Sequence, residues 1–167
     1  MKIVTILGAR PQFVKAAVIS DKVNDIENLI EVIVHTGQHF DQSMSDIFFN
    51  EMDIPQPKYN LNINQMSHGQ MTATMMEKIE PILMNEKPNG VLVYGDTNST
   101  LAGSLTAAKL NIPVFHVESG LRSYNREMPE EINRVMTDHL SKLLFCPTEN
   151  AVNILAKEGI QKGVKDC

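Results

Sequence analysis

Five short runs of mostly apolar, β-branched residues recur along the chain, and they constrain its fold more than any other feature. The runs lie at 3–7, 31–36, 91–94, 114–117 and 143–146. Apolar residues follow one another in them almost without polar alternation, which is typical of parallel strands covered on both faces. Segments with helical spacing of apolar residues separate the runs. This order of strand and helix predicts a doubly wound α/β domain with a parallel sheet.

Besides a helix that follows the strand at 91–94, four helices are predicted from apolar spacing and from proline and glycine signals. They cover 10–23, 67–84, 129–140 and 149–159. We expect each helix to bury one apolar stripe. The stripes of the first and third helices consist of Phe13, Val14, Ala17 and Val18, and of Ile132, Val135, Met136, His139 and Leu140. Pro81 lies inside the second segment and is expected to kink it or to begin a short second helix.

Length and composition indicate one domain that spans residues 1–167. Of the 167 residues, 43% are apolar, which is enough to bury a core without disulfides or metal ions. The Pro- and Asn-rich segment 53–70 is expected to be a surface loop. Segment 162–167 follows the last predicted helix and carries no obvious further strand. Either the sheet is complete or the sequence is a piece of a longer protein.

Charge and cysteine content argue against several classes of protein. The net charge of −5 disfavours binding of nucleic acid, because such surfaces carry clustered positive charge. The first apolar run is too short for a membrane span, and the amino terminus lacks the layout of a signal peptide. Cys146 and Cys167 form no CxxC motif, which suits a reduced, cytoplasmic protein in which Cys146 is a buried thiol.

Polar and charged residues gather directly after the predicted strands. The segments that follow the first four strands are 8–11, 37–39, 95–98 and 118–122. They contain arginine, histidine and two carboxylates, whereas the opposite ends of the strands show no comparable cluster. In an open parallel sheet, a ligand binds in the crevice beyond the carboxyl ends of the strands. The sequence therefore predicts a binding site at this edge.

Arg10 stands at the start of the first predicted helix, where free N–H groups and the helix dipole favour an anion. Lys15 lies about one turn further and is expected to assist. The structural alternative is that Gly8 only makes a tight turn and that Lys15 is a solvated helix lysine. The segment contains neither a Walker A loop nor a GxGxxG pattern, so it encodes no standard phosphate cradle.

Asp96 stands between the third strand and the helix that follows it. As a helix cap, it would contribute about 1 kcal/mol. Thr97, Asn98 and Ser99 are equally able to cap this helix, so a cap does not require the aspartate. We therefore expect Asp96 to face a ligand.

Glu118 and Glu130 also have structural alternatives. Glu118 ends a buried strand and must find a partner or shift its pKa, and Arg122 is close enough in sequence for an ion pair. Glu130 lies in the first turn of a predicted helix, and its spacing to Arg134 is i,i+4. Taken alone, that spacing indicates an ordinary ion pair on the surface of a helix.

The histidines do not have the spacing of a metal-binding set. They are His35, His39, His68, His116 and His139. We expect no metal site and no cofactor, and we expect His139 to be a core residue of its helix.

Five motifs taken together resemble the non-hydrolysing UDP-N-acetylglucosamine 2-epimerase family. They are GARPQFVK, HTGQHFD, VLVYGDTNSTLAG, HVESGLRS and MPEEINR. They occur in the family's order and spacing from residue 1 to about residue 160, and the set is far more specific than any single piece. The resemblance implies a Rossmann-like domain, the amino-terminal half of a two-domain GT-B-type fold that holds a nucleotide sugar between its halves.

The resemblance also implies a reaction, used in making precursors of bacterial surface polysaccharides. UDP is eliminated across C1 and C2 of a UDP-2-acetamido sugar and adds back through a glycal intermediate, with the proton returned to the opposite face of C2. By motif, the catalytic carboxylates are Asp96, Glu118 and Glu130. The corresponding substrate-binding residues are Arg10, Lys15, Gln38, His39, Thr97, Arg122 and Arg134.

Two segments depart from many bacterial members of the family. The loop between GLR and PEE is only SYNREM, where those members have a longer, aromatic-containing loop. After QH the chain reads FDQSMSDIFF, where those members carry a glutamine-bearing helix that binds a second substrate molecule as an activator. Both segments resemble the branch that acts on modified sugars such as UDP-2,3-diacetamido-2,3-dideoxyglucuronic acid.

The partners implied by the resemblance are a UDP-sugar, a carboxy-terminal domain of the same full-length protein and a second copy in a homodimer. We expect no nucleic acid and no membrane partner. Because the other half of such an enzyme supplies most uridine and diphosphate contacts, residues 1–167 alone are expected to fold but to be inactive. The competing functions are a GT-B glycosyltransferase, which would pass the sugar to an acceptor, and a non-catalytic nucleotide-sugar-binding domain.

Overall fold

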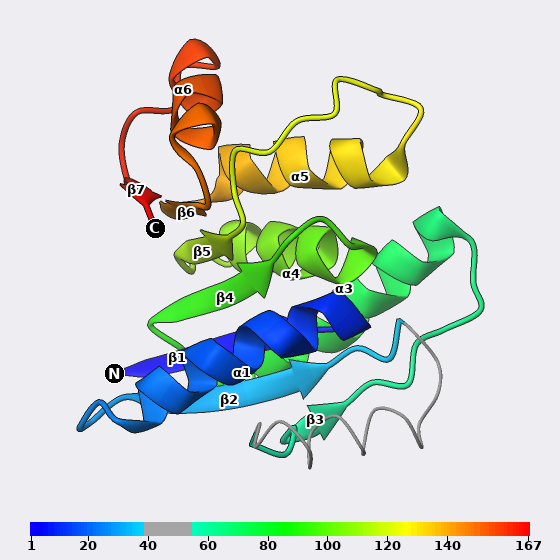
Figure 1. Ribbon diagram of the computed structural model, residues 1–167. Helices are drawn as coiled ribbons and strands as arrows, with labels where there is room; N and C mark the ends of the chain where they lie inside the picture. Colours follow the sequence, from blue (N-terminus) through cyan, green and yellow to red (C-terminus); the bar gives the residue numbers. More distant parts are fainter. Residues whose placement is uncertain (39–54) are drawn as a thin grey trace.

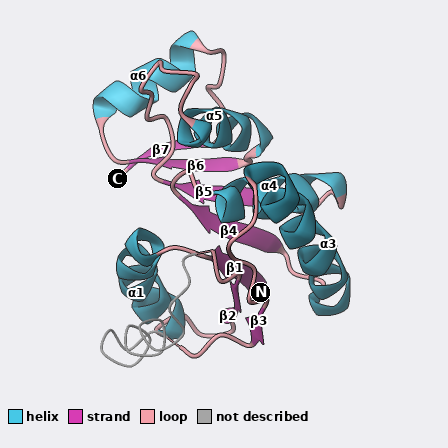
Figure 2. Ribbon diagram, turned by 90° about the vertical axis from the view of Figure 1, so that its right-hand side faces the viewer, coloured by secondary structure: helices cyan, strands magenta, loops and turns pink. Residues whose placement is uncertain are grey.

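The computed structural model describes residues 1–38 and 55–167, which form a seven-stranded sheet with helices on both faces (Figure 2). The strand order is β3-β2-β1-β4-β5-β6-β7. The strands are β1 (Lys2–Leu7), β2 (Ile30–His35), β3 (Tyr59–Asn60), β4 (Gly90–Tyr94), β5 (Val114–Val117), β6 (Leu143–Cys146) and β7 (Val164–Asp166). Every neighbouring pair is parallel, which confirms the predicted doubly wound α/β class.

The two outermost strands are absent from the prediction. β3 lies within the segment predicted to be a loop, and β7 lies in the terminal segment that was expected to carry no strand. Both are short and partly exposed, because an edge strand needs a partner on one side only. Such strands lack the continuous apolar run by which the five inner strands are recognised.

Five helices are found among the described residues, and they divide between the two faces of the sheet (Figures 1 and 2). They are α1 (Arg10–Asn24), α3 (His68–Glu86), α4 (Asn98–Lys109), α5 (Pro129–Leu140) and α6 (Glu149–Lys157). α1 covers one face, whereas α3, α4 and α5 lie side by side on the other.

Two large apolar cores lie between the sheet and helices α1, α3 and α4, and a smaller one lies between β6 and α6. The core under α3 and α4 includes Val4, Val34, Met75, Ile79 and Leu83. The core under α1 includes Leu7, Phe13, Ala16, Ile33 and Tyr94. Cys146 is buried as a free thiol, as predicted. Each described helix is too short or too polar to cross a lipid bilayer.

α3 runs through Pro81 without interruption, so the alternative of a second short helix beginning there is wrong. The helix ends at Glu86, and its C-cap is Lys87, a residue in the left-handed conformation whose N–H donates to Leu83 O. The packing of Met75, Ile79 and Leu83 on the sheet holds the segment on both sides of the proline.

The predicted apolar stripe of α1 is partly wrong. Phe13 is buried, but Val14 and Val18 are 51% and 67% exposed. The buried stripe consists of Gln12, Phe13, Ala16, Ser20 and Val23. Gln12 is drawn inward by backbone groups of the neighbouring turns, and this sets the rotation of the helix.

α5 departs further from the prediction, because it buries its polar face. Ile132 and Met136 are exposed, and the side chain of His139 is 49% exposed, so His139 is not a core residue. The buried residues are Glu131, Asn133, Thr137 and Asp138. Each of these side chains bonds to α4, to β5 or to the loop before α5, which compensates for burial of its polar atoms.

Candidate active site

The turns after β1, β4 and β5 lie next to one another at the carboxyl edge of the sheet. β1 is the switch point: β2 and β3 extend the sheet on one side of it and β4 on the other. Ile6 pairs with Val93, so the turns that begin at Gly8 and Gly95 are neighbours. Tyr94 pairs with Val117, which brings Glu118 beside Gly95. The crevice at such a switch point is where open α/β sheets bind ligands.

Arg10 is the exposed first residue of α1. The turn before it requires glycine, because a Cβ on Gly8 would lie 2.0 Å from Ser99 Oγ and 2.2 Å from Thr36 Oγ. The chain of β1 therefore passes directly against the amino terminus of α4. This contact places Arg10 and the first turn of α4 at the same edge.

Gln12 joins the Arg10 turn to the Asp96 turn. Its side-chain oxygen accepts from the N–H groups of Gly8 and Ala9 at 2.7 and 2.9 Å. Its amide nitrogen donates to three oxygens on the other side: Tyr94 O at 2.8 Å, Thr97 Oγ at 3.0 Å and Thr100 Oγ at 3.0 Å. Gln12 is not among the predicted site residues, although its place as third residue of the helix, where glutamine reaches back to the cap, was a usable signal.

Gln38 covers the first turn of α4 from the end of β2. Its side-chain oxygen accepts from Ser99 N–H at 3.0 Å and from Ser99 Oγ–H at 2.7 Å. Gln38 is therefore part of the same edge, and its predicted contact with substrate stays a prediction. His39, the next predicted residue, lies outside the described residues.

Asp96 does not cap α4. Thr97 is the cap, and its Oγ accepts from Thr100 N–H at 3.3 Å. The Asp96 carboxylate instead forms an ion pair with Arg134, which reaches across from α5 and also binds Glu131 at 3.1 Å. The Asp96 side chain is 32% exposed, so it remains accessible beside its cation.

Glu118 is held in an uncommon backbone conformation, with φ of 72°. A non-glycine residue there is strained, and such strain is concentrated at functional sites. Its carboxylate forms an ion pair with Lys15 of α1, so the predicted alternative of a pair with Arg122 is wrong. The carboxylate passes over Gly95, where a Cβ would lie 3.2 Å from Glu118 Oε2.

Arg122 lies inside the domain, with its side chain 1% exposed. It donates to Asp138 Oδ2 at 2.7 Å and to the two carboxylate oxygens of Glu158 at 2.9 and 2.7 Å. Burial alone would lower the pKa of Arg122, but the bonds to Glu158 and Asp138 raise it above its ordinary value. The guanidinium is thus occupied within the domain, and the substrate contact expected of Arg122 has no support from this geometry.

Glu130 is exposed in the first turn of α5, and the pair with Arg134 proposed from their spacing is replaced by the pairs of Arg134 with Asp96 and Glu131. Glu131 is buried instead and accepts from the N–H groups of Ser123 and Tyr124, both at 2.9 Å. Burial would raise the pKa of Glu131, but these donors and Arg134 lower it. Glu131 thereby anchors the loop before α5.

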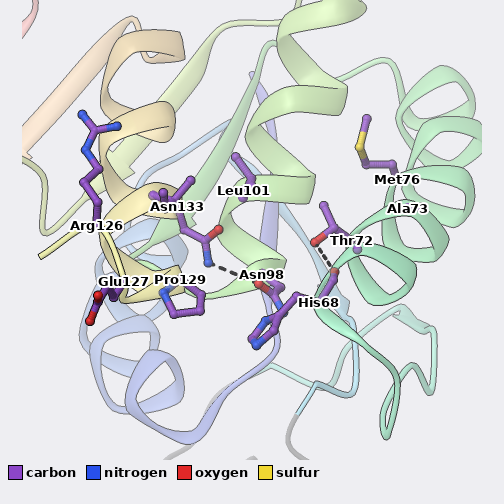
Figure 3. A pocket seen from close by; sticks show the side chains of 12 residues that line it. His68, Thr72, Ala73, Met76, Asn98, Leu101, Arg126, Glu127, Pro129 and Asn133 are labelled. Carbon is purple, nitrogen blue, oxygen red and sulfur yellow. Dashed lines mark hydrogen bonds between the residues drawn. The ribbon is translucent and has the colours of Figure 1, made fainter.

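A hollow of about 560 Å³ opens between the amino-terminal ends of α3, α4 and α5 (Figure 3). Asn133 and Asn98 face each other at its floor, with a hydrogen bond of 3.2 Å, and Asn133 also donates to Asp96 O at 2.9 Å. Asn98 lies 3.2 Å from Nδ1 of His68. The hollow therefore adjoins the Asp96 turn from the side of α5.

A second hollow, of about 220 Å³, lies on the other side of the edge and is bordered by Lys15, Glu118 and Phe145. Glu118 borders this second hollow, and Asp96 lies in the turn that adjoins the first; each carboxylate is paired with a cation from a different helix. Paired carboxylates beside cations at a sheet edge suit proton transfer on a ligand that carries negative charge.

The comparisons with known proteins agree with this geometry. The family model described as UDP-N-acetylglucosamine 2-epimerase matches residues 21–164. The chain belongs to this family. A UDP-2,3-diacetamido-2,3-dideoxy-D-glucuronate 2-epimerase from Pseudomonas aeruginosa is 57% identical over 162 residues, covering 97% of this chain and 46% of that protein. A UDP-N-acetylglucosamine 2-epimerase homolog from Methanococcus maripaludis is 59% identical over 164 residues, covering 98% of this chain and 45% of that protein.

A solved structure gives the same result for the fold. The UDP-GlcNAc 2-epimerase of Methanocaldococcus jannaschii, in complex with UDP-GlcNAc and UDP, has a TM-score of 0.95 and 51% identity. The likeness covers 99% of this chain and 46% of that one. The chain thus spans about half the length of the relatives it matches, and the Rossmann-like fold extends over nearly all of it.

Proposed function

We propose that this domain binds a UDP-2-acetamido sugar and supplies acid–base groups for non-hydrolysing epimerisation at C2. The observation that carries the proposal is that Asp96 and Glu118 follow the neighbouring strands β4 and β5. The strand register places Glu118 beside Gly95, the residue before Asp96, and each carboxylate has its own cationic partner. Family membership supports the same reaction.

The reaction needs a base and an acid on opposite faces of C2. One carboxylate takes the C2 proton while the C1–O bond breaks, UDP leaves with the electron pair and a C1=C2 double bond forms. In the return step, UDP adds to C1 and a proton is delivered to the other face of C2. The carboxylates that serve these steps are Asp96, Glu118 and Glu130, and we assign neither direction to any one of them.

Cationic and polar side chains around the edge would hold the departing UDP. Lys15 is ion-paired with Glu118, and Arg134 with Asp96, so each cation is already close to a reacting carboxylate. Arg10 adds a cation at the amino terminus of α1, where N–H groups favour an anion. Gln38 and Thr97 border the same turn. We propose these five as the substrate-contacting set of this domain, together with His39.

A specific observation favours a second candidate substrate, UDP-2,3-diacetamido-2,3-dideoxyglucuronic acid. The Pseudomonas aeruginosa relative named for that sugar is 57% identical to this chain. The loop before α5 is also short, and Glu131 ties it down at Ser123 and Tyr124. Both substrates require the same chemistry at C2.

The experiment uses the full-length protein in D₂O with each of the two UDP-sugars. We expect the 2-epimer to form and deuterium to appear at C2, both followed by NMR. Release of UDP only after an acceptor is added would instead indicate a glycosyltransferase. Tight binding of the UDP-sugar without exchange or turnover would indicate a binding domain.

Three further proposals concern the setting of the enzyme. We propose that a carboxy-terminal domain completes the cleft, because the matched relatives are about twice as long as this chain. We propose a homodimer, supported by the exposed apolar side of α5, where Ile132 and Met136 are 39% and 46% exposed. We propose a cytoplasmic location, supported by two free cysteines.

A further inference from the structure

A buried polar cluster lies behind the two carboxylates of the proposed site, and the reaction as described above does not use it. Its centre is Asp138, on the inward face of α5, with a fully buried side chain. Asp138 Oδ1 lies 2.7 Å from His116 Nδ1. Its Oδ2 accepts from Gly120 N–H at 3.1 Å and from Arg122 Nη1 at 2.7 Å.

His116, in the middle of β5, extends this cluster to the Asp96 turn. Its side chain is fully buried, and Nε2 lies 2.7 Å from the carbonyl oxygen of Gly95. A carbonyl oxygen only accepts, so Nε2 donates to it. Burial would raise the pKa of Asp138, but the contacts with His116 and Arg122 lower it, so the carboxylate is ionised and accepts from Nδ1. The imidazole therefore links the Asp138 carboxylate to the carbonyl of Gly95.

The hydrogen bonds of Asp138 and His116 end at two backbone groups, one near each proposed reacting carboxylate. At one end, His116 holds the carbonyl of Gly95, whose next residue is Asp96. At the other end, Asp138 holds the N–H of Gly120, two residues after Glu118. Both turns have left-handed backbone, with φ of 61° at Gly95 and 78° at Gly120. One aspartate thus connects two turns that come from different strands.

The charged groups of the cluster are paired within the domain. Facing Asp138 are the imidazole of His116 and the guanidinium of Arg122, and Arg122 in turn binds Glu158 of α6. His139 stands 3.6 Å from Glu158. Asp138, His116 and Arg122 are 0–1% exposed at their side chains, so they are screened from a ligand at the edge. Their contribution to the reaction would be indirect.

We propose that Asp138 and His116 are a positioning pair that sets the Asp96 turn against the Glu118 turn. This role rests on the proposed epimerase function for its effect on turnover, but the coupling of the two turns is a property of the fold. The pair keeps the two carboxylates at the separation and orientation that C2 requires. A misplacement of reacting groups by about 1 Å costs about 100-fold in rate.

Two substitutions, one isosteric and one to a smaller side chain, test the anchoring of the Asp96 turn separately from that of the Glu118 turn. Asp138→Asn keeps the shape but removes the negative charge and one of the two acceptor oxygens, so the bonds that hold both turns are weakened. His116→Asn keeps a donor toward Asp138 but is too short to reach Gly95, so only the Asp96 turn is released. Thr137→Val is the matched control, because Thr137 is buried next to Asp138 on the same helix and bonds to Ser104 of α4 at 3.2 Å, away from both turns.

The first measurement is amide hydrogen exchange of the full-length protein without substrate. We expect Asp138→Asn to speed exchange in peptides that cover residues 92–98 and 117–122. His116→Asn should speed exchange in 92–98 alone, and Thr137→Val in neither. Equal protection of both peptides in all variants would overturn the proposal. So would faster exchange spread evenly over the domain in both Asp138→Asn and Thr137→Val.

The second measurement is steady-state epimerisation by the same proteins. We expect kcat to fall about 10- to 100-fold in Asp138→Asn and His116→Asn while KM changes by less than about twofold, because the cluster does not touch substrate. Thr137→Val should retain wild-type kcat. A rise in KM with unchanged kcat in these two variants would contradict the proposal. If the wild-type protein turns over neither UDP-sugar, the proposed function fails, and the exchange pattern still decides whether the pair couples the turns. If Asp138→Asn does not fold, the exchange rates and kcat of His116→Asn test the positioning role instead.

Discussion

Lys15 and Glu118 are 103 residues apart in the sequence and form an ion pair at the carboxyl edge of the sheet. Their side chains are partly exposed, and such a pair contributes about 1 kcal/mol or less to folding. We therefore expect the pair to matter more for the proposed reaction than for the free energy of unfolding. It joins α1, which carries Arg10, to the strained residue at the end of β5.

Substitution of Lys15 should separate these two roles. We expect Lys15→Gln to lower kcat/KM of the full-length enzyme by about 100-fold, as for loss of a charge-stabilising donor. The urea midpoint should change little. Lys22→Gln is the control, because Lys22 lies on the same helix and forms exposed pairs with Asp21 and Asp25. Equal activity of the two variants would contradict the role given to Lys15.

Removal of the carboxylate charges should stop exchange at C2. Asp96→Asn and Glu118→Gln each keep the size of the side chain but remove the base, and we expect kcat to fall by about 100- to 10,000-fold. Deuterium incorporation into the UDP-sugar, measured by NMR, should fall in parallel. Glu149→Gln, at the exposed first turn of α6, should be as active as wild type. Undiminished exchange in both Asp96→Asn and Glu118→Gln would refute the acid–base proposal.

Gly95 should not tolerate a side chain. Its φ is 61°, and an added Cβ would lie 3.2 Å from Glu118 Oε2. We expect Gly95→Ala to cost about 1 kcal/mol or more in unfolding free energy and to reduce kcat by displacing Glu118. Gly69→Ala is the comparison, because Gly69 lies in α3 with no atom within 4 Å of the new Cβ. That variant should be neutral or slightly more stable in a urea titration; a Gly95→Ala protein equal to it would disprove the strain argument.

Glu86 should make stability depend on pH at the acid end. Hydrogen bonds from Lys58, Tyr59 and Lys2 lower the pKa of Glu86 from 4.5 to about 2, against the opposing effect of burial. The folded state therefore binds this proton less readily than the unfolded state, and the stabilisation is complete above about pH 4.5 and lost as the pH falls toward 2.

Glu86→Gln tests this dependence. We expect the variant to be less stable than wild type by about 1–2 kcal/mol at pH 6, a value below the full shift because Lys58 is largely solvated. The difference should shrink between pH 4.5 and 2 in urea titrations. A difference that stays constant down to pH 2 would show that the carboxylate charge is not its source.

The exposed side of α5 should support the proposed homodimer. A charge placed there would be buried without a partner in a dimer, so we expect Ile132→Lys to weaken association by at least about tenfold in sedimentation experiments. Val18→Lys is the control on α1, on the opposite side of the sheet, where the side chain is 67% exposed. Equal association of the two variants, or a monomeric wild type, would exclude this face.

The inner strands and the class of fold were predictable because their signal is local. A strand covered on both faces must be apolar along its length, and the five inner strands show this wherever they occur. β3 and β7 escaped prediction because an edge strand is half exposed and needs no such run. The place of the site was also predictable, since the carboxyl ends of parallel strands must meet at one edge.

The sequence by itself determined the doubly wound sheet, its polar edge and the residues gathered there, because apolar periodicity and strand direction are properties of neighbours along the chain. Only the tertiary structure decided which charges meet. Lys15 binds Glu118, and Asp96 binds Arg134, across elements that no spacing relates. It also turned the polar face of α5 inward, since Asp138 finds three donors there and burial of a bonded carboxylate can replace burial of Ile132.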